Sequence, residues 1–467
     1  MLTNEDTIAA IATPLGPGGI GIIRISGVLA PQILDTLFMP YQDGESWQSH
    51  RLYAGRVVEP KSGAVLDEAL AVLMRAPHSY TREQVAELHC HGGPAVLPAV
   101  LAACIAAGAR LAERGEFTLR AFLNGALSLD EAEAVADLIG AKTAAAAQMA
   151  ARQLQGALNL RLAPLEQELL AILAHLTVGV DFPEDADAPV AEDLLPRLAG
   201  LRQQIAALLA GAEAGRIYRE GYQVVLAGAT NVGKSSLLNR LLQTERAIVT
   251  AEAGTTRDLI EEAINVEGLP LLLTDTAGLR DMDGLTEAEA QGIKRSHAAL
   301  AAAQLVLIVT DATLGLDETA RALLAESADG QWPPLLVLNK ADLLNEQELE
   351  ARRAEYKEQC PESTMAVVSA KTGSGIAELL AQIKDLALAG FAETGREPLI
   401  NNIRHQQALL RADTCLAEAA QTLTEGLPPD MATIDLENAY AALGEISGKT
   451  AGEEVLANIF AKFCVGK

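Results

Sequence analysis

The sequence predicts a multidomain protein that combines α/β and all-α parts, with an α/β domain inserted in a helical domain and a mixed α/β domain before both. Three patterns support this. Strand and helix signals alternate over 216–382, Ala- and Leu-rich helical patterns fill 121–215 and 383–467, and short strands between turns dominate 1–120. Because helical sequence lies on each side of 216–382, we expect one helical domain carrying a movable α/β unit.

Within the first 120 residues the pattern predicts short strands and one apolar helix over 94–107. The predicted strands are 7–13, 19–25, 69–74 and 85–89. In the helical region that follows, an acidic loop containing a proline interrupts the pattern near 181–187. A length of 467 residues suits about three domains of ordinary size.

Composition limits the class of protein. A hydrophobic content of 49% supports real cores, and an aromatic content of 3% means that Ala, Leu and Val build them. The net charge of −26 argues against a general polyanion-binding surface, so any RNA contact must be local or supplied by a basic partner. The five cysteines form no C-x-x-C pair, which argues against a zinc site and a disulfide framework. Without a basic signal sequence or a membrane-length apolar run, we expect a soluble cytoplasmic protein with no membrane contact.

Residues 228–235 form a phosphate-binding P-loop motif, Gly-Ala-Thr-Asn-Val-Gly-Lys-Ser, between an apolar strand pattern and a helical pattern. Its two glycines let backbone N–H groups turn toward phosphate oxygens, and the following helix directs its positive dipole end to the same place. Lys234 adds a positive charge at the β and γ phosphates. The hydroxyl of Ser235 can hold Mg²⁺.

The base is indicated further along the chain, where an apolar strand run ends in Asn339-Lys340-Ala341-Asp342. The Asp342 carboxylate can accept hydrogen bonds from both N1–H and the 2-amino group of guanine, a donor pair that adenine lacks. The motif therefore favours GTP over ATP. After another strand pattern, Ser369-Ala370-Lys371 is suited to backbone contact with the guanine edge.

Two further segments complete the nucleotide motifs. A strand pattern leads into 275–278, Asp-Thr-Ala-Gly, where Asp275 can hold the Mg²⁺ shell and the Gly278 N–H can contact the γ-phosphate. Between it and the P-loop lies 254–258, Gly-Thr-Thr-Arg-Asp, whose Thr256 hydroxyl can complete the Mg²⁺ coordination. The order of these segments predicts a P-loop GTPase domain.

Outside these motifs, several stretches have distinctive sequences: 8–14, 18–27, 77–83, 91–93, 115–117, 120–124 and 463–467. A P-loop occurs in many families, whereas the run at 8–27 and the final Phe-Cys-Val-Gly-Lys are specific to one. On these stretches and the loop at 254–258, the chain resembles the MnmE, or TrmE, family of tRNA modification GTPases over essentially its whole length. This family is one of the TrmE-Era-EngA-like GTPases.

The resemblance implies a homodimer joined through the N-terminal domain, which would bind a 5-formyltetrahydrofolate-type one-carbon donor. It implies a complex with the FAD protein MnmG that installs an aminomethyl-type group, carboxymethylaminomethyl or aminomethyl, at C5 of the tRNA wobble uridine. The implied folate contacts are Arg24, Glu87 and Lys467, with Ala126 where the family often has lysine. A carboxylate such as Glu87 can pair with the aminopyrimidinone edge of a pterin.

Hydrolysis needs a group other than the usual glutamine. Leu279 follows the 275–278 segment, and an apolar side chain cannot orient the attacking water. The resemblance implies that two GTPase domains meet around K⁺, which supplies positive charge. Asn231 matches the K⁺-binding asparagine, with further ligands from Thr250, Glu252 and Thr255.

The resemblance also implies a catalytic glutamate in the second switch. Alignment on 292–295 selects Glu289, whereas counting from Gly278 selects Glu287. We favour Glu289, because a helix anchor should persist when a loop before it lengthens. The predicted nucleotide-binding residues are Asn231, Val232, Gly233, Lys234, Ser235, Ser236, Thr250, Ala251, Glu252, Ala253, Gly254, Thr255, Thr256, Asp275, Thr276, Ala277, Gly278, Asn339, Lys340, Ala341, Asp342, Ser369, Ala370 and Lys371.

Two alternatives accompany these predictions. His89 and His91 bracket Cys90, but no second cluster completes a metal site, so we expect a structural role at a strand end. The alternative function is a GTP-dependent ribosome or RNA assembly factor whose helical regions are docking surfaces. No KH-like GxxG module and no basic tail follow the GTPase motifs, and this favours the tRNA modification enzyme.

Overall fold

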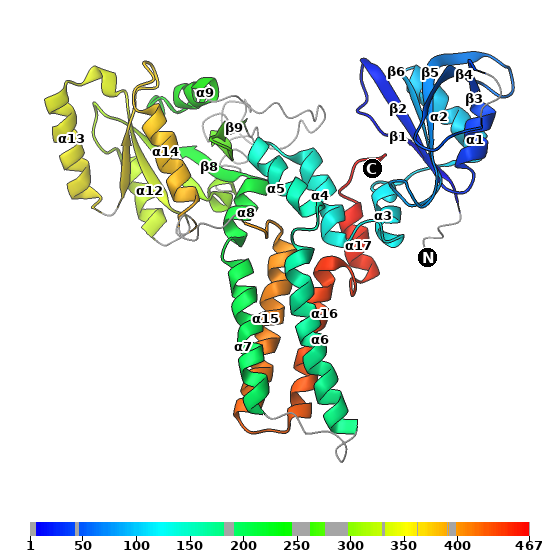
Figure 1. Ribbon diagram of the computed structural model, residues 1–467. Helices are drawn as coiled ribbons and strands as arrows, with labels where there is room; N and C mark the ends of the chain where they lie inside the picture. The colour runs from blue at the N-terminus through cyan, green and yellow to red at the C-terminus, as the bar shows by residue number, and fades with distance from the viewer. Residues whose placement is uncertain are drawn as a thin grey trace, which may run out of the picture. The chain divides into compact units, whose positions relative to one another are not determined.

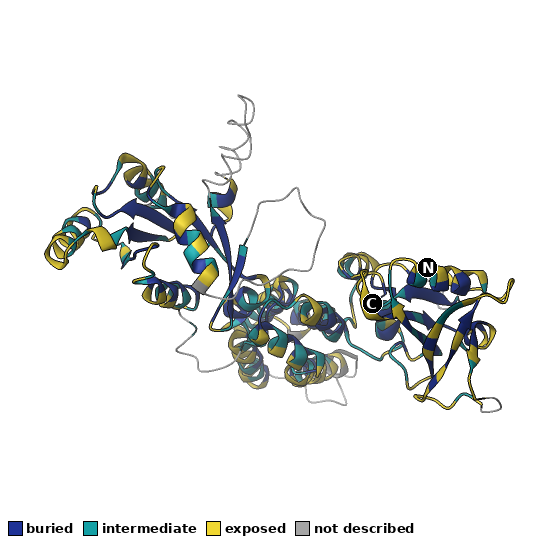
Figure 2. Cartoon of the chain, turned by 90° about the horizontal axis from the view of Figure 1, so that it is seen from above, coloured by how far each residue is buried: buried dark blue, intermediate teal, exposed yellow. Residues whose placement is uncertain are grey.

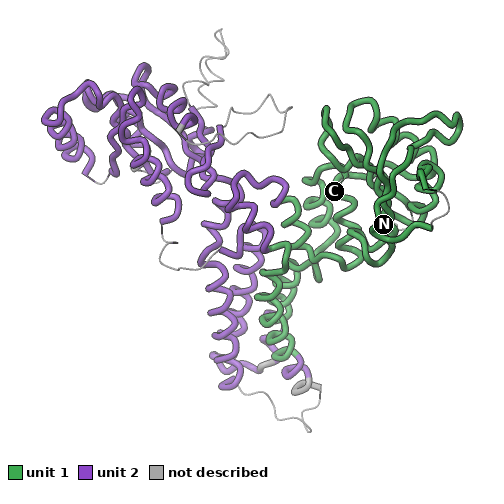
Figure 3. Tube along the Cα trace, turned by 45° about the horizontal axis from the view of Figure 1, so that its top comes forward, with its two compact units in different colours: residues 1–136, 153–173, 436–467 green, residues 137–152, 174–435 purple. Residues whose placement is uncertain are grey.

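The computed structural model describes residues 6–42, 46–181, 191–244, 262–275, 298–328, 332–361, 363–389, 391 and 398–466 (Figure 1). The chain forms two compact units, coloured separately in Figure 3. The first consists of Met1–Ala136, Gln153–Leu173 and Leu436–Lys467, and the second of Asp137–Arg152 and Ala174–Asp435. Among the described helices, none has the length and apolar content needed to cross a membrane.

In the described part of the first unit, seven strands form one sheet in the order β3-β4-β5-β6-β2-β1-β7. The strands are β1 Ile8–Ile11, β2 Gly18–Ser26, β3 Phe38–Pro40, β4 Leu52–Val58, β5 Val65–Met74, β6 Val85–Gly92 and β7 Arg110–Leu111. Helices α1 (Ala30–Leu37) and α2 (Val96–Ala106) bury apolar side chains against this sheet, including Ile33, Leu34 and Val100. The four predicted strands and the predicted helix are confirmed, while α1, β3, β4 and β7 were not predicted.

Strand β4 was not predicted because Gly55, in its interior, is a residue type that usually indicates a turn. A Cβ on Gly55 would lie 2.3 Å from the carbonyl oxygen of Met39 on the neighbouring strand β3. The glycine is therefore required by the close approach of two backbones and does not mark a turn.

The second unit contains a sheet of six described strands in the order β13-β12-β11-β8-β10-β9, parallel except for β9 at the edge. The strands are β8 Tyr222–Ala227, β9 Glu262–Val266, β10 Leu269–Asp275, β11 Leu305–Asp311, β12 Pro334–Asn339 and β13 Thr364–Val367. The described helices that follow strands of this sheet include α9 Lys234–Thr244, α12 Glu318–Ala328, α13 Glu346–Gln359 and α14 Ile376–Ala387. The alternating pattern predicted over 216–382 is thus confirmed.

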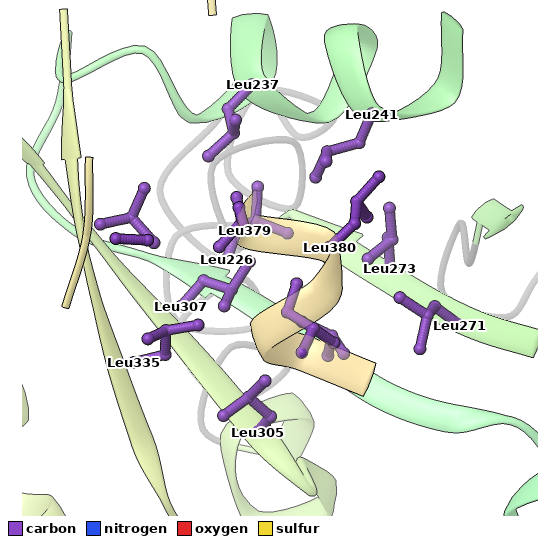
Figure 4. Close-up of a cluster of buried hydrophobic side chains, with 14 of the residues drawn as sticks. Leu226, Leu237, Leu241, Leu271, Leu273, Leu305, Leu307, Leu335, Leu379 and Leu380 are labelled. Atoms are coloured by element: carbon purple, nitrogen blue, oxygen red, sulfur yellow. The ribbon is translucent and has the colours of Figure 1, made fainter. Parts of the chain in front are cut away.

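Helices cover both faces of this sheet. Leu237 and Leu241 of α9 and Leu379 of α14 pack with strand leucines on one face (Figure 4). Ala320 of α12 and Tyr356 of α13 pack on the other face. The strands are consequently buried on both sides, as their dark colour in Figure 2 shows, and they are near-continuous apolar runs in the sequence. Such a sheet presents the carboxyl ends of its parallel strands at one edge, where ligands bind in open α/β folds.

The remaining elements are helical. They are α3 Glu116–Leu123, α4 Leu129–Gly140, α5 Ala144–Leu154, α6 Asn159–Asp181, α7 Ala191–Leu209, α8 Ala212–Glu220, η1 Ala341–Leu343, α15 Ile403–Thr424, η2 Pro429–Ala432, α16 Thr433–Ser447 and α17 Glu453–Phe460. In the sequence, helix α7 comes before the strands of the six-stranded sheet and helix α15 comes after them. Arg202 of α7 nevertheless forms an ion pair with Asp413 of α15 at 2.8 Å. Most of the acidic loop predicted near 181–187 lies outside the described residues. The division into three domains stays a prediction.

Candidate nucleotide-binding site

The loop that joins β8 to α9 has a backbone that only glycine accommodates at two points. Gly228 has φ +141° and Gly233 has φ +97°. A Cβ on Gly228 would lie 2.3 Å from the carbonyl oxygen of Val309, and one on Gly233 would lie 2.4 Å from Nδ2 of Asn339. These glycines therefore permit both the turn of the loop and its close packing on β11 and β12.

Lys234 and Ser235, at the first turn of α9, have hydrogen-bond partners around the loop. Nζ of Lys234 donates to the carbonyl oxygens of Gly228 at 2.9 Å and Ala229 at 2.7 Å, so the buried ammonium lies inside the loop. The Ser235 hydroxyl donates to Oδ2 of Asp275 at 2.8 Å. A hydroxyl and a carboxylate are oxygen donors of the kind that Mg²⁺ prefers, so this pair fits a Mg²⁺ ion.

Asn339, at the end of β12, joins the P-loop to the loop after β13. Its Nδ2 donates to the carbonyl oxygen of Val232 at 2.9 Å, and its Oδ1 accepts from the Ala370 N–H at 3.0 Å. The side chain is buried, so its polar atoms depend on these partners. Asn339 therefore links two loops that are distant in the sequence.

Lys340 and Asp342 continue this motif. Lys340 has φ +63°, in the left-handed region, and its Nζ donates to the carbonyl oxygen of Asn231 at 2.9 Å. Asp342 accepts a hydrogen bond from the Ser369 hydroxyl at 2.6 Å, and that hydroxyl oxygen accepts from the Thr372 N–H at 3.1 Å. The predicted guanine-binding segments are thus adjacent to each other and to the P-loop.

Two residues at this site escaped prediction. Arg240 of α9 donates to the carbonyl oxygens of Ala370 at 2.9 Å and Lys371 at 2.6 Å, and no sequence signal marks it. Asp311 ends β11 and forms an ion pair with Lys340 at 2.7 Å. A carboxylate at the end of a buried strand, between the Asp275 strand and the Asn339 strand, was a usable signal for Asp311.

The electrostatic environment of Asp311 favours its charged form. Burial raises its pKa, but hydrogen bonds from Lys340 and from the Thr313 hydroxyl and N–H more than offset this, so the pKa lies below the usual value. The carboxylate is therefore a permanent negative charge beside Lys340 at neutral pH.

Several predicted site residues lie outside the described residues, and their roles stay predictions. They are Thr250, Ala251, Glu252, Ala253, Gly254, Thr255, Thr256, Thr276, Ala277, Gly278, Leu279, Glu287, Glu289 and Lys467.

In the first unit, Arg24 and Glu87 are directly paired across β2 and β6. Nε of Arg24 donates to Oε1 of Glu87 at 2.9 Å, and Nε2 of His89 lies 3.1 Å from Oε2. The Arg24 guanidinium lies over the rings of Tyr80 and Phe117, 5.5 and 5.8 Å from their centroids. Burial raises the pKa of Glu87, but the hydrogen bonds and charges of His89 and Arg24 lower it by more. The pKa of Glu87 is therefore below the usual value.

The other residues singled out in this unit have ordinary surroundings. His91 forms a hydrogen bond with Asp67, Nδ1 to Oδ1 at 2.8 Å. In the part of the chain that the structure describes, no three His, Cys, Asp or Glu side chains are grouped to hold a metal. Ala126 is half-buried, and its N–H donates to the carbonyl oxygen of Ala121 at 2.7 Å.

A doubly wound sheet, a P-loop after β8 and an Asn-Lys-x-Asp motif bonded to that loop define a GTP-binding P-loop protein. Two family models match the chain, "MnmE helical domain" over residues 129–464 and "GTP-binding protein TrmE N-terminus" over 7–126. The chain belongs to the MnmE family of tRNA modification GTPases, and it is a GTP hydrolase.

Curated relatives agree with this assignment. The "tRNA modification GTPase MnmE" of Symbiobacterium thermophilum is 46% identical over 466 residues, covering 99% of this chain and 100% of the relative. That of Geobacter sulfurreducens is 44% identical over 465 residues, covering 99% of each. Among solved structures, Era from Aquifex aeolicus aligns over 41% of this chain and 66% of its own, with 24% identity and a TM-score of 0.30.

Proposed function

We propose that this chain is a K⁺-dependent GTPase that modifies tRNA together with an FAD protein of the MnmG type. The pair installs an aminomethyl-type group at C5 of the wobble uridine and takes its one-carbon unit from a 5-formyltetrahydrofolate-type donor. The proposal rests above all on 46% identity to a tRNA modification GTPase over 99% of the chain. The presence of the P-loop and guanine motifs in one connected site supports it.

GTP would lie on the P-loop. Lys234 would exchange its two loop carbonyls for the β and γ phosphate oxygens, because an ammonium prefers the more charged acceptor. Ser235 and Asp275 would hold Mg²⁺, which neutralises phosphate charge when bound, with Thr256 as a further ligand. Asp342 would exchange its Ser369 bond for the guanine donors.

The K⁺ ion would be bound by Asn231, with Thr250, Glu252 and Thr255. The left-handed backbone of Asn231, held by the Lys340 contact, supports a fixed orientation for this ligand. The ion would supply the charge that an arginine gives in related enzymes when two GTPase domains meet. Glu289 would then orient the attacking water.

The K⁺ requirement is tested by measuring GTP turnover in KCl and in NaCl. We expect several-fold faster turnover in KCl, and an Asn231→Ala variant should lose this difference while it still binds GDP. Asn345→Ala is the matched control, since Asn345 caps α13 in the same unit and should leave the K⁺ response unchanged. Equal rates in the two salts would refute the mechanism.

The catalytic glutamate is tested by comparing two variants. Glu289→Ala should abolish turnover and leave GTP binding intact, whereas Glu287→Ala should retain turnover. The reverse result would assign the water-orienting role to Glu287.

The folate-type donor would bind at Arg24 and Glu87, with Lys467 as a third contact. The Glu87 carboxylate is held in its charged form, which suits pairing with the donor edge of a pterin. Glu87→Gln should weaken binding of 5-formyltetrahydrofolate about ten-fold or more in a calorimetric titration. Glu68→Gln is the control, since Glu68 is an exposed carboxylate on the next strand. Equal affinities in the three proteins would refute this site.

The whole assignment is tested by mass spectrometry of tRNA nucleosides from a strain that lacks the gene. We expect loss of C5-aminomethyl-type uridines, and restoration by the wild-type chain but not by Lys234→Ala. An unchanged nucleoside profile with altered ribosome profiles would favour the assembly-factor function. Light scattering during gel filtration should give the mass of a homodimer.

A further inference from the structure

Lys340 is held at both its backbone and its ammonium group. Its backbone is in the left-handed region, and its Nζ lies between the Asn231 carbonyl oxygen at 2.9 Å and Oδ2 of Asp311 at 2.7 Å. Lysine has a flexible stem, so an ammonium without a fixed partner loses considerable rotamer entropy when it must hold one position. Asp311 is placed to reduce that loss.

Asp311 is held in place by contacts that do not involve Lys340. Its Oδ1 accepts from the Thr313 N–H at 2.9 Å and from the Thr313 hydroxyl at 2.7 Å. The residue lies at the end of β11, and its Cα partner across the sheet is Asn339. Lys340 directly follows that strand partner, so the carboxylate and the lysine start from neighbouring positions, and Oδ2 is free of Thr313 and contacts Nζ.

The contact has a consequence for the P-loop. Asn231 has φ +64°, a conformation that costs free energy for a residue with a side chain. Its carbonyl oxygen accepts from Nζ of Lys340, while the next carbonyl, that of Val232, accepts from Asn339. Two successive P-loop carbonyls are thus held from the end of β12, and one of the two bonds depends on where the Lys340 ammonium lies.

We propose that Asp311 is a positioning residue of the GTP site. It holds the Lys340 ammonium against the Asn231 carbonyl and so keeps the P-loop in its binding conformation before the nucleotide arrives. Asp311 does not touch the nucleotide. The inference rests on the proposed assignment of Lys340 and Asn231 to this site.

The test is a calorimetric titration of the full chain with GDP in NaCl, which makes it independent of K⁺ and of tRNA. Asp311→Asn keeps the size and an oxygen for Thr313 but removes the charge, and it should weaken GDP binding about ten-fold. Lys340→Met should weaken it at least as much. The double variant should bind no more weakly than Lys340→Met alone, because Asp311 acts only through Lys340.

The matched control is Asp317→Asn, since Asp317 accepts a backbone N–H near the start of α12 and makes no described contact with the P-loop. It should leave GDP affinity unchanged. Thr313→Val loosens Asp311 without altering its charge and should give a smaller loss of about three-fold, which keeps the test available if Asp311→Asn folds poorly. Thermal melts show whether each variant is folded.

Unchanged GDP affinity in folded Asp311→Asn, with a loss in Lys340→Met, overturns the role of Asp311. A further ten-fold loss from Asp311→Asn in the Lys340→Met background also overturns it, since Asp311 would then act by another route. Wild-type affinity in Lys340→Met refutes instead the proposed nucleotide site.

Discussion

Arg120 is a buried cation whose removal should destabilise the first unit. Its side chain is 3% exposed, and it donates to the Asp6 carbonyl oxygen at 2.8 Å, to Asp6 Oδ1 at 2.6 Å and to Glu116 Oε1 at 2.9 Å. Both Glu83 oxygens lie 3.4 Å away. Arg120→Met keeps an unbranched apolar stem in place of the arginine stem and removes all of these bonds.

The loss in free energy of unfolding depends on which hydrogen bonds the partners of Arg120 retain in the variant. Glu116 retains two bonds from Arg110 and one from the Glu113 N–H, and Glu83 retains the Ser26 hydroxyl. The Asp6 carboxylate is 41% exposed, so water replaces most of its lost pair. The main losses are the charged bonds to Glu116 and to the Asp6 carbonyl, at about 1.5 kcal/mol or more each, which gives about 3 kcal/mol.

The assay uses the chain's two tryptophans, of which Trp47 lies in the first unit and Trp332 in the second. In a Trp332→Phe background, urea unfolding followed by fluorescence reports the first unit alone. With a slope of about 2 kcal/mol per molar urea, the midpoint should fall by about 1.5 M. Arg56→Met is the control, because that guanidinium is 52% exposed and lies 3.6 Å from Glu68, and it should change the free energy of unfolding by under about 0.5 kcal/mol.

A loss below about 1 kcal/mol for Arg120→Met would refute this reasoning. It would mean that Arg110 and water compensate the buried carboxylates without help.

Three other predictions follow from the same contacts. Burial raises the pKa of Glu116, but Arg110 and other donors lower it below the usual value, so this carboxylate stabilises the first unit fully at neutral pH. The stabilisation is lost on acidification, and the urea concentration at the unfolding midpoint of the first unit should therefore decrease when the pH is lowered below about 4.5. Gly233→Ala should weaken GDP binding about 100-fold, because the new Cβ would clash with Nδ2 of Asn339. Gly373→Ala is the control, since Gly373 also has a positive φ but a Cβ there would lie in open space, and its GDP affinity should change little. Similar GDP affinities in the two variants would contradict the steric argument. Asp342→Asn should shift preference from GTP toward xanthosine triphosphate, and an unchanged GTP affinity would show that Asp342 does not contact the base.

The sequence predicted the elements whose pattern is local. Strands β8, β10 and β12 are near-continuous apolar runs because helices cover both faces of their sheet. Such a run in the sequence directly predicts a buried strand. Strand β4 carries Gly55 for a contact with β3, and the short helix α1 begins with no side-chain cap, so neither had a local signal.

The same distinction applies to the site. The P-loop and the Asn-Lys-x-Asp motif are contiguous, and each residue type follows from the ligand atom it would meet. Arg240 donates to the Ala370 carbonyl oxygen, 130 positions further along the sequence, and only the fold brings α9 beside the loop after β13. Arg24 and Glu87 were predicted separately, and their direct pairing is a property of the register between β2 and β6.

The first unit is assembled from three stretches of chain, and this has a consequence for synthesis on the ribosome. Phe463, near the end of the third stretch, is buried with Leu129 and Val135 from the first, and Gly466 lies so close to Ile11 that a Cβ would be 2.3 Å from its carbonyl oxygen. All of Ala174–Asp435 is translated before those last residues appear. The second unit can therefore fold before the third stretch of the first unit is made, and until then Leu129 and Val135 lack the apolar partner that Phe463 provides.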